Sequence, residues 1–143
     1  MSLERKPVLL GVDYGLVRVG LAVSDAAGLT AQPVGVFPAA NAENLLAEMQ
    51  RVMSERDIRK IVVGLPLNMD GSEGPAAQSA RQFAAFLSER LAVEVVLWDE
   101  RLSTFQADRS MLDRDLSRKK RAQRRDAIAA QFILQSYLDA QSR

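Results

Sequence analysis

The sequence of 143 residues contains no cysteine and no histidine. The absence of cysteine excludes disulfide bonds and thiolate metal sites, and it agrees with a reducing compartment. The absence of histidine removes the commonest general base and the commonest nitrogen ligand of metals. Any metal binding or acid–base chemistry in this chain must therefore use other side chains, and carboxylates are the first candidates.

The sequence also lacks internal repeats, low-complexity tracts and long apolar runs. The polar start, MSLERKP, predicts no signal peptide, and no segment is apolar enough to predict a membrane span. A hydrophobic content of 48% and this length fit a single domain over residues 1–143. We therefore expect a soluble cytoplasmic protein with no membrane partner.

Apolar β-branched runs and helical spacings alternate along the chain in the order β-β-β-α-β-α-β-α-α. Strand-like runs occupy residues 8–13, 17–24, 32–37, 58–65 and 93–98, and helical patterns occupy residues 42–56, 76–91, 103–112 and 126–140. Short turns between the first three strands predict antiparallel neighbours, whereas helical crossovers predict that the two later strands run parallel to the first. The sequence thus predicts an α/β fold with a mixed five-stranded sheet and helices on both faces.

Three acidic residues stand at the ends of apolar segments. Asp13 closes the first strand, Glu100 follows the fifth strand, and Asp126 precedes the apolar stripe of the last helix. A carboxylate at the rim of a core is costly to desolvate unless a cation meets it. Converging carboxylates without histidine predict a hard, oxygen-binding cation, Mg²⁺ or Mn²⁺.

Each acid also has a purely structural interpretation. Asp13 can cap a turn, and Asp126 can be the N-cap of the last helix. Arg101 can form a surface ion pair with Asp99 or Glu100, so the separate roles of these acids stay open. Asp126 lies one turn before a stripe of apolar residues that faces the core, which favours the site interpretation.

Basic residues concentrate just before Asp126. Residues 109–125 hold eight basic and two acidic side chains, in a chain whose net charge is only +1. Such a stretch predicts a polyanionic partner, although a solvated charged loop is the alternative. The predicted nucleic-acid-binding residues are Arg101, Arg118, Lys119, Lys120, Arg121, Arg124 and Arg125. We expect residues 113–124 to be a mobile loop, because they offer little apolar surface to bury.

Small and polar residues in the turns form a weaker candidate phosphate or substrate site. The residues concerned are Gly15, Asn68, Gly71, Ser103 and Thr104. Glycine lets another group approach the backbone closely, and Ser103 or Thr104 can N-cap a following helix.

Together these motifs resemble the YqgF/RuvX family, which is described as pre-16S rRNA nucleases related to RuvC-type Holliday junction resolvases. The resemblance rests on residues 11–15 (GVDYG), 18–25 (RVGLAVSD), 63–71 (VGLPLNMDG), 99–104 (DERLST) and 126–130 (DAIAA). It implies an RNase H-like fold with Asp13, Glu100 and Asp126 as the active-site acids. The RuvC relatives look to carry a Glu after the fourth strand, where this chain has Leu65 and Pro66, so the resemblance implies that Glu100 substitutes for it.

The favoured prediction is a divalent-metal-dependent nuclease that hydrolyses phosphodiester bonds in 5′-end processing of pre-16S rRNA. A resolvase of branched DNA and a noncatalytic nucleic-acid-binding factor are alternatives. An actin-like nucleotide-binding module is a further alternative, because the first hairpin resembles a phosphate-binding hairpin, but this chain is too short to close two domains around ATP. RNA is favoured over DNA. Endo- or exonuclease action, Mg²⁺ or Mn²⁺, one metal or two, and monomer or homodimer stay open.

Overall fold

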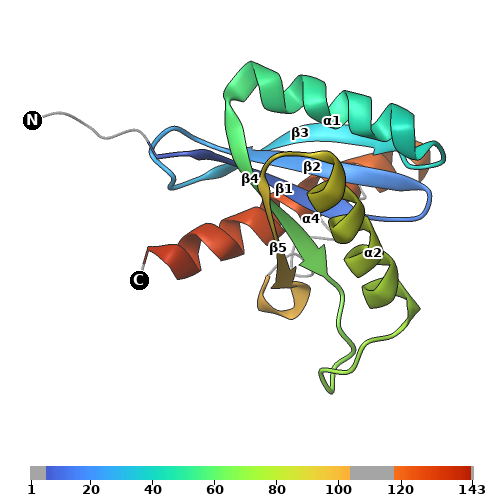
Figure 1. The fold of residues 1–143 in the computed structure, drawn as a ribbon. Coiled ribbons are helices and arrows are strands. Elements are labelled where there is room, and N and C mark those ends of the chain that lie inside the picture. The colour runs from blue at the N-terminus through green and yellow to red at the C-terminus, as the bar shows by residue number, and fades with distance from the viewer. Residues whose placement is uncertain (1–5, 104–117, 143) are drawn as a thin grey trace, which may run out of the picture.

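The computed structural model describes residues 6–103 and 118–142 (Figure 1). Its strands are β1 (Val8–Tyr14), β2 (Arg18–Ser24), β3 (Ala31–Pro38), β4 (Ile58–Leu65) and β5 (Glu94–Asp99). Its helices are α1 (Ala42–Arg56), α2 (Pro75–Arg90), the short 3₁₀ helix η1 (Glu100–Leu102) and α4 (Arg118–Gln141). The helix predicted over residues 103–112 lies outside the described residues, apart from Ser103.

The strands form one sheet in the order β3-β2-β1-β4-β5. β1 pairs antiparallel with β2 and β2 antiparallel with β3, whereas β4 and β5 run parallel to β1. The predicted mixed sheet is therefore confirmed. Because β1, β4 and β5 are parallel, the residues that follow their carboxyl ends meet at one edge of the sheet.

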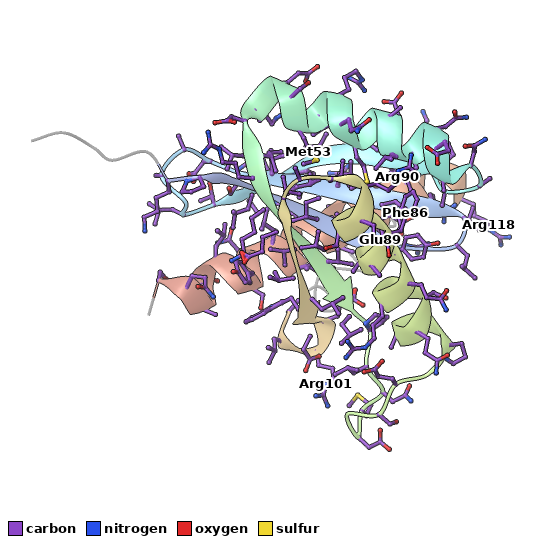
Figure 2. The ribbon with its side chains drawn as sticks, in the orientation of Figure 1. Met53, Phe86, Glu89, Arg90, Arg101 and Arg118 are labelled. Atoms are coloured by element: carbon purple, nitrogen blue, oxygen red, sulfur yellow. The ribbon has the colours of Figure 1, made fainter. Side chains whose placement is uncertain are left out.

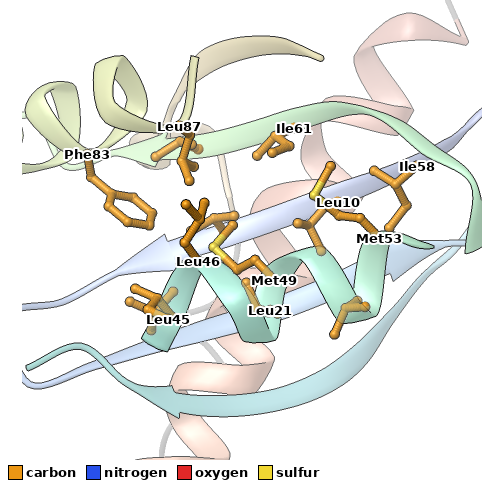
Figure 3. Packing of buried hydrophobic residues seen from close by; sticks show 14 of the residues in the cluster. Leu10, Leu21, Leu45, Leu46, Met49, Met53, Ile58, Ile61, Phe83 and Leu87 are labelled. Atoms are coloured by element: carbon orange, nitrogen blue, oxygen red, sulfur yellow. The ribbon is translucent and has the colours of Figure 1, made fainter. Parts of the chain in front are cut away.

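Helices α1 and α2 cover one face of the sheet (Figure 1). Their apolar residues recur at helical spacing and pack on strand residues such as Leu10, Leu21 and Ile61, all of which are fully buried (Figure 3). Asn41 is the N-cap of α1, and its side-chain oxygen accepts a hydrogen bond from the main-chain NH of Asn44. Burial of this many large aliphatic side chains is the main source of stability of the domain.

Helix α4 covers the opposite face, and three glycines let it lie unusually close to the strands. A Cβ atom at position 11 would be 2.7 Å from Cβ of Leu134, and one at position 64 would be 2.6 Å from Cδ1 of Ile133. A Cβ atom at position 20 would overlap the main-chain oxygen of Asp126. Glycine at these positions is therefore a requirement of close packing rather than of backbone conformation.

The last helix differs from the prediction. Residues 118–125 are already helical, so the expected loop over 113–124 is wrong for 118–124, and residues 113–117 lie outside the described chain. Arginine, lysine and glutamine are good helix formers, and the segment contains neither glycine nor proline to end the helix. Asp126 consequently lies inside α4, and its interpretation as the N-cap of this helix is wrong.

Candidate active site

Asp13 and Glu100 come from strands that are not neighbours. Asp13 lies near the end of β1 and Glu100 directly after β5, with β4 between them. Gly64 of β4 makes their approach feasible, because a Cβ atom there would be only 2.9 Å from Cγ of Glu100. The missing side chain leaves the space through which Glu100 crosses β4 toward Asp13.

The carboxyl groups of Asp13 and Glu100 lie within hydrogen-bonding distance, with protonated Glu100 as the donor. Burial, followed by the negative charge of Asp126, raises the pKa of Asp13 to about 6. Burial, followed by the charge of Asp13 and the hydrogen bond to it, raises the pKa of Glu100 to about 8. Two carboxyls this close do not both ionise readily, so the pair retains a proton near neutral pH.

Asp126 reaches the same region from α4, and its charge is close enough to raise the pKa of Asp13. Its carboxylate accepts a hydrogen bond of 2.5 Å from Nε of Arg18, at the start of β2. The packing of α4 on Gly20 determines this position. The main-chain oxygen of Asp126 occupies the space that a side chain at position 20 would fill. Asp126 is therefore beside the acid pair, but its carboxylate is paired with an arginine.

Among residues 6–103 and 118–142, no group of three or more His, Cys, Asp or Glu side chains is arranged as a metal site. The donors nevertheless suit a hard cation. Asp13 and Glu100 already present carboxyl oxygens to each other, and a divalent cation would remove the repulsion that keeps one of them protonated. Asp13, Glu100 and Asp126 are the residues that would hold it, and their role as ligands stays a prediction.

Arg101 has partners within the protein. Its guanidinium pairs with Asp99 at 2.9 Å, and Nη1 donates to the main-chain oxygen of Met69 at 3.2 Å. The hydrogen bonds from Arg101 hold the pKa of Asp99 below its ordinary value. Arg101 thus ties η1 to the loop after β4, and its predicted contact with nucleic acid would have to form in addition to these bonds.

The loop after β4 is held by its own polar groups. The side-chain amide of Asn68 donates to Oγ of Ser72, whose hydroxyl donates to Asp70 at 2.6 Å. Gly71 adopts a φ of 88°, which favours glycine, and its NH donates to the main-chain oxygen of Asn68. These contacts explain Asn68 and Gly71 structurally, and a role in phosphate binding stays a prediction.

Two other predicted turn residues have similar structural explanations. A Cβ atom at position 15 would be 2.8 Å from the main-chain oxygen of Arg18, so Gly15 permits the tight turn between β1 and β2. The hydroxyl of Ser103 donates backward to the main-chain oxygen of Glu100 and closes η1. Thr104 lies outside the described residues.

The remaining predicted nucleic-acid-binding residues belong to the first two turns of α4. These are Arg118, Lys119, Lys120, Arg121, Arg124 and Arg125. Arg118, Lys120 and Arg124 are exposed, and Figure 2 shows Arg118 well separated from Arg101. A phosphate backbone would need to extend across the domain to contact both.

Arg18 is the site residue that the sequence did not single out. It lies two positions before Gly20, and Gly20 pairs with Asp13 across β1 and β2. Side chains two apart on a strand share a face, so this spacing places Arg18 on the face that carries Asp13. The strand alternation within residues 11–20 is a signal from which the location of Arg18 can be predicted. The pairing of Arg18 with Asp126, 108 positions away, has no such signal in the sequence.

The mixed five-stranded sheet in the order β3-β2-β1-β4-β5, with helices on both faces, is an RNase H-like fold. The family model described as "RuvX: Holliday junction resolvase" matches residues 7–140. The chain belongs to this family.

Curated relatives and solved structures agree with this assignment. A protein of Myxococcus xanthus named "Putative pre-16S rRNA nuclease" is 50% identical over 131 residues, covering 92% of this chain and 87% of the relative. A protein of the same name from Rhodobacter capsulatus is 46% identical over 138 residues, covering 96% of this chain and 87% of the relative.

The fold is similar to that of T. thermophilus RuvC in complex with a Holliday junction, with a TM-score of 0.55 and 18% identity over 96% of each chain. It is also similar to the Fowlpox virus resolvase in complex with Holliday junction DNA, with a TM-score of 0.53 and 12% identity over 95% of this chain and 99% of that one. No helix in the described part of the chain is both long enough and apolar enough to cross a membrane.

Proposed function

We propose that this protein is a divalent-metal-dependent nuclease that processes the 5′ end of pre-16S rRNA in the cytoplasm. The observation that carries the proposal is the contact between Asp13 and Glu100 across Gly64, with Asp126 beside it. Holding two partly buried carboxyl groups against one another costs free energy, and a cation bound between them would offset that cost.

Each acid has a distinct part in this proposal. Asp13 ionises at lower pH than Glu100 and would be the first to present a carboxylate. Glu100 holds the shared proton and would release it when a cation neutralises the pair. Mg²⁺ or Mn²⁺ held by Asp13, Glu100 and Asp126 would supply Lewis-acid activation of water and stabilisation of the leaving oxygen. This donor set explains how a chain without histidine could hydrolyse a phosphodiester.

The names of relatives that share 42–50% identity over most of the chain support RNA as the substrate. The exposed basic residues at the start of α4 support binding to a phosphate backbone, a contact that positions a substrate without reading its bases. A second candidate is the resolution of branched DNA, which the family description and the likeness to junction-bound resolvases favour.

A cleavage assay on single-stranded RNA carrying a pre-16S 5′ leader, on duplex RNA and on a four-way DNA junction distinguishes the two. Each substrate is incubated with Mg²⁺, Mn²⁺ or EDTA, and the products are mapped to separate endo- from exonuclease action. We expect cleavage of the leader with Mg²⁺ or Mn²⁺ and none with EDTA. Preferential cutting of the junction would replace RNA processing by resolution, and equal cleavage in EDTA would reject the metal site.

Sedimentation of the same preparation, with and without substrate, distinguishes a monomer from a homodimer. A single monomeric species under both conditions would reject the homodimer.

A further inference from the structure

The ion pair between Arg18 and Asp126 places a cationic side chain on one of the three predicted metal ligands. Nε of Arg18 is 2.5 Å from Oδ2 of Asp126, and the two side chains are 35% and 28% exposed. A divalent cation that used the carboxylate of Asp126 would have to compete with this guanidinium. The pair is partly open to water, so its rearrangement carries no large desolvation cost.

The strand geometry keeps Arg18 at the site whether or not it is paired with Asp126. Arg18 is the first residue of β2, two positions before Gly20, which pairs with Asp13. Its Cβ therefore projects from the sheet face that carries Asp13, and its long side chain is anchored within reach of the acids. If the guanidinium leaves Asp126, the nearest anion that a nuclease introduces here is the phosphate of its substrate.

The chemistry of the guanidinium suits that second partner. Its planar fork of NH donors matches two oxygens of a carboxylate or two oxygens of a phosphate, and its charge persists at any working pH. One side chain can thus neutralise Asp126 in the metal-free protein and a phosphate in the loaded one.

We infer that Arg18 is a substrate-binding residue that exchanges Asp126 for the phosphate at the cleavage site when a divalent cation binds. The inference rests on the proposed metal-dependent nuclease function. It makes Asp126 available only while a cation is present, and it makes tight phosphate binding by Arg18 conditional on that cation.

The first test measures Mn²⁺ affinity without nucleic acid, from the free Mn²⁺ signal in electron paramagnetic resonance. Arg18→Gln removes the competitor of the metal, and it should tighten Mn²⁺ binding by about two- to fivefold, the equivalent of a partly exposed ion pair. Arg59→Gln is the matched control, because it removes the same charge from an exposed pair with Asp57 at the start of β4. Unchanged or weaker Mn²⁺ binding in Arg18→Gln, relative to this control, would overturn the inference.

The second test needs no metal and uses the salt dependence of binding to a short single-stranded RNA in EDTA. Asp126→Asn should release Arg18 to the phosphate backbone and steepen the plot of log affinity against log salt by about 0.7, the value of one phosphate contact. The double variant Asp126→Asn with Arg18→Gln should return the slope to the wild-type value. Equal slopes in the single and double variants would overturn the inference.

Arg18→Lys covers the case in which Arg18→Gln does not fold, as judged by its thermal unfolding. Lysine keeps a positive charge beside the carboxylate of Asp126, so Mn²⁺ affinity should stay near wild type. It lacks the planar fork of NH donors that binds a phosphate, so cleavage should fall. Mn²⁺ affinity that changes in Arg18→Lys, or cleavage that does not fall, would overturn the inference.

The two proposals fail in different ways. If the wild-type protein binds no Mn²⁺, the metal-dependent function fails, whereas the metal-free slopes still report whether Arg18 moves to phosphate.

Discussion

The two faces of the sheet are built by different rules. The face under α1 and α2 is filled by large aliphatic side chains, among which Leu10, Met49 and Leu87 are fully buried. The face under α4 is lined by Gly11, Gly20 and Gly64, which admit the helix almost to backbone contact. The first face buries apolar surface, whereas the second lets α4 approach the strands closely.

Polar contacts add to this difference. On the α4 face, Gln131 and Gln135 each bond to the main chain of Ala31, and the indole NH of Trp98 donates to Ser136. Hydrogen bonds are directional, so they fix the position of α4 along and around its axis more closely than apolar packing does. The candidate site therefore lies on the face where hydrogen bonds and close packing fix the position of the helix, and not on the face that contributes most of the apolar core.

Replacing an acid of the candidate site should affect cleavage far more than replacing an exposed acid elsewhere on the surface. Asp13→Asn should lower the cleavage rate by about a thousandfold or more, because it replaces a proposed anionic metal ligand by a neutral amide. Asp57→Asn is an equally conservative change at an exposed residue in the left-handed conformation that asparagine also accepts, and it should leave the rate unchanged. Single-turnover cleavage of both variants measures the difference, and comparable losses would remove Asp13 from the site.

On the α1 face, Leu46→Ala should destabilise the protein by about 2–5 kcal/mol, because the side chain of Leu46 is only 4% exposed and its truncation leaves a cavity in the core. Its Mn²⁺ affinity should nevertheless match wild type at temperatures where it is folded. Urea unfolding and a Mn²⁺ titration provide the two measurements. A loss of metal affinity in the folded variant would show that the two faces are not independent.

On the α4 face, Gly20→Ala should affect both stability and metal binding. The added methyl group would overlap the main-chain oxygen of Asp126 and push α4 away, at a cost of about 1–3 kcal/mol in stability. Unlike Leu46→Ala, it should also weaken Mn²⁺ binding, because Asp126 moves with the helix. Gly74→Ala is the control, since its Cβ atom would meet only ordinary contacts of 3.7 Å or more. If Gly20→Ala binds Mn²⁺ as tightly as the wild-type protein, the close packing of α4 on β2 is not needed to position Asp126 for metal binding.

Stability without metal should depend on pH through the acid pair. The pKa values of Asp13 and Glu100 rise from ordinary values of 3.8 and 4.5 to about 6 and about 8 on folding. The folded protein therefore binds more protons than the unfolded chain between these limits, and its stability falls as pH rises from about 4 to 8, by roughly 2 kcal/mol per pH unit at the steepest point, where both groups contribute.

Urea unfolding in EDTA at several pH values tests this sign. The double variant Asp13→Asn with Glu100→Gln should show a flatter dependence, because it carries neither titrating group. If the free energy of unfolding depends on pH in the same way in the wild-type protein and in the double variant, the two carboxyl groups are not held together.

The smallest effect concerns the exposed basic residues of α4. Replacing Arg118, Lys120 and Arg124 by alanine should weaken RNA binding similarly for all sequences. It should also lower the salt slope by about 0.7 for each phosphate contact that is lost. Stability should change little, since all three side chains are exposed. An unchanged slope would show that this part of α4 is only a solvated surface.

The sequence predicted the sheet well because strands and turns are local. The bounds of β4 and α1 agree with their apolar spacing, and the order of elements determined which strands are parallel. The last helix begins earlier than predicted. Residues 118–124 offer little apolar surface to bury, which favours a loop, but their arginines, lysines and glutamine are good helix formers.

The sequence alone was enough to predict the order of elements along the chain and the directions of the strands, to exclude histidine and cysteine chemistry, and to identify three candidate acids. Which of these acids lie together depends on the tertiary structure. It brought Glu100 to Asp13 through the space that Gly64 leaves, and it paired Asp126 with Arg18 from 108 positions away. The physical reason is that periodicity reports contacts between residues a few positions apart, whereas the separation of side chains from different elements depends on how closely those elements pack.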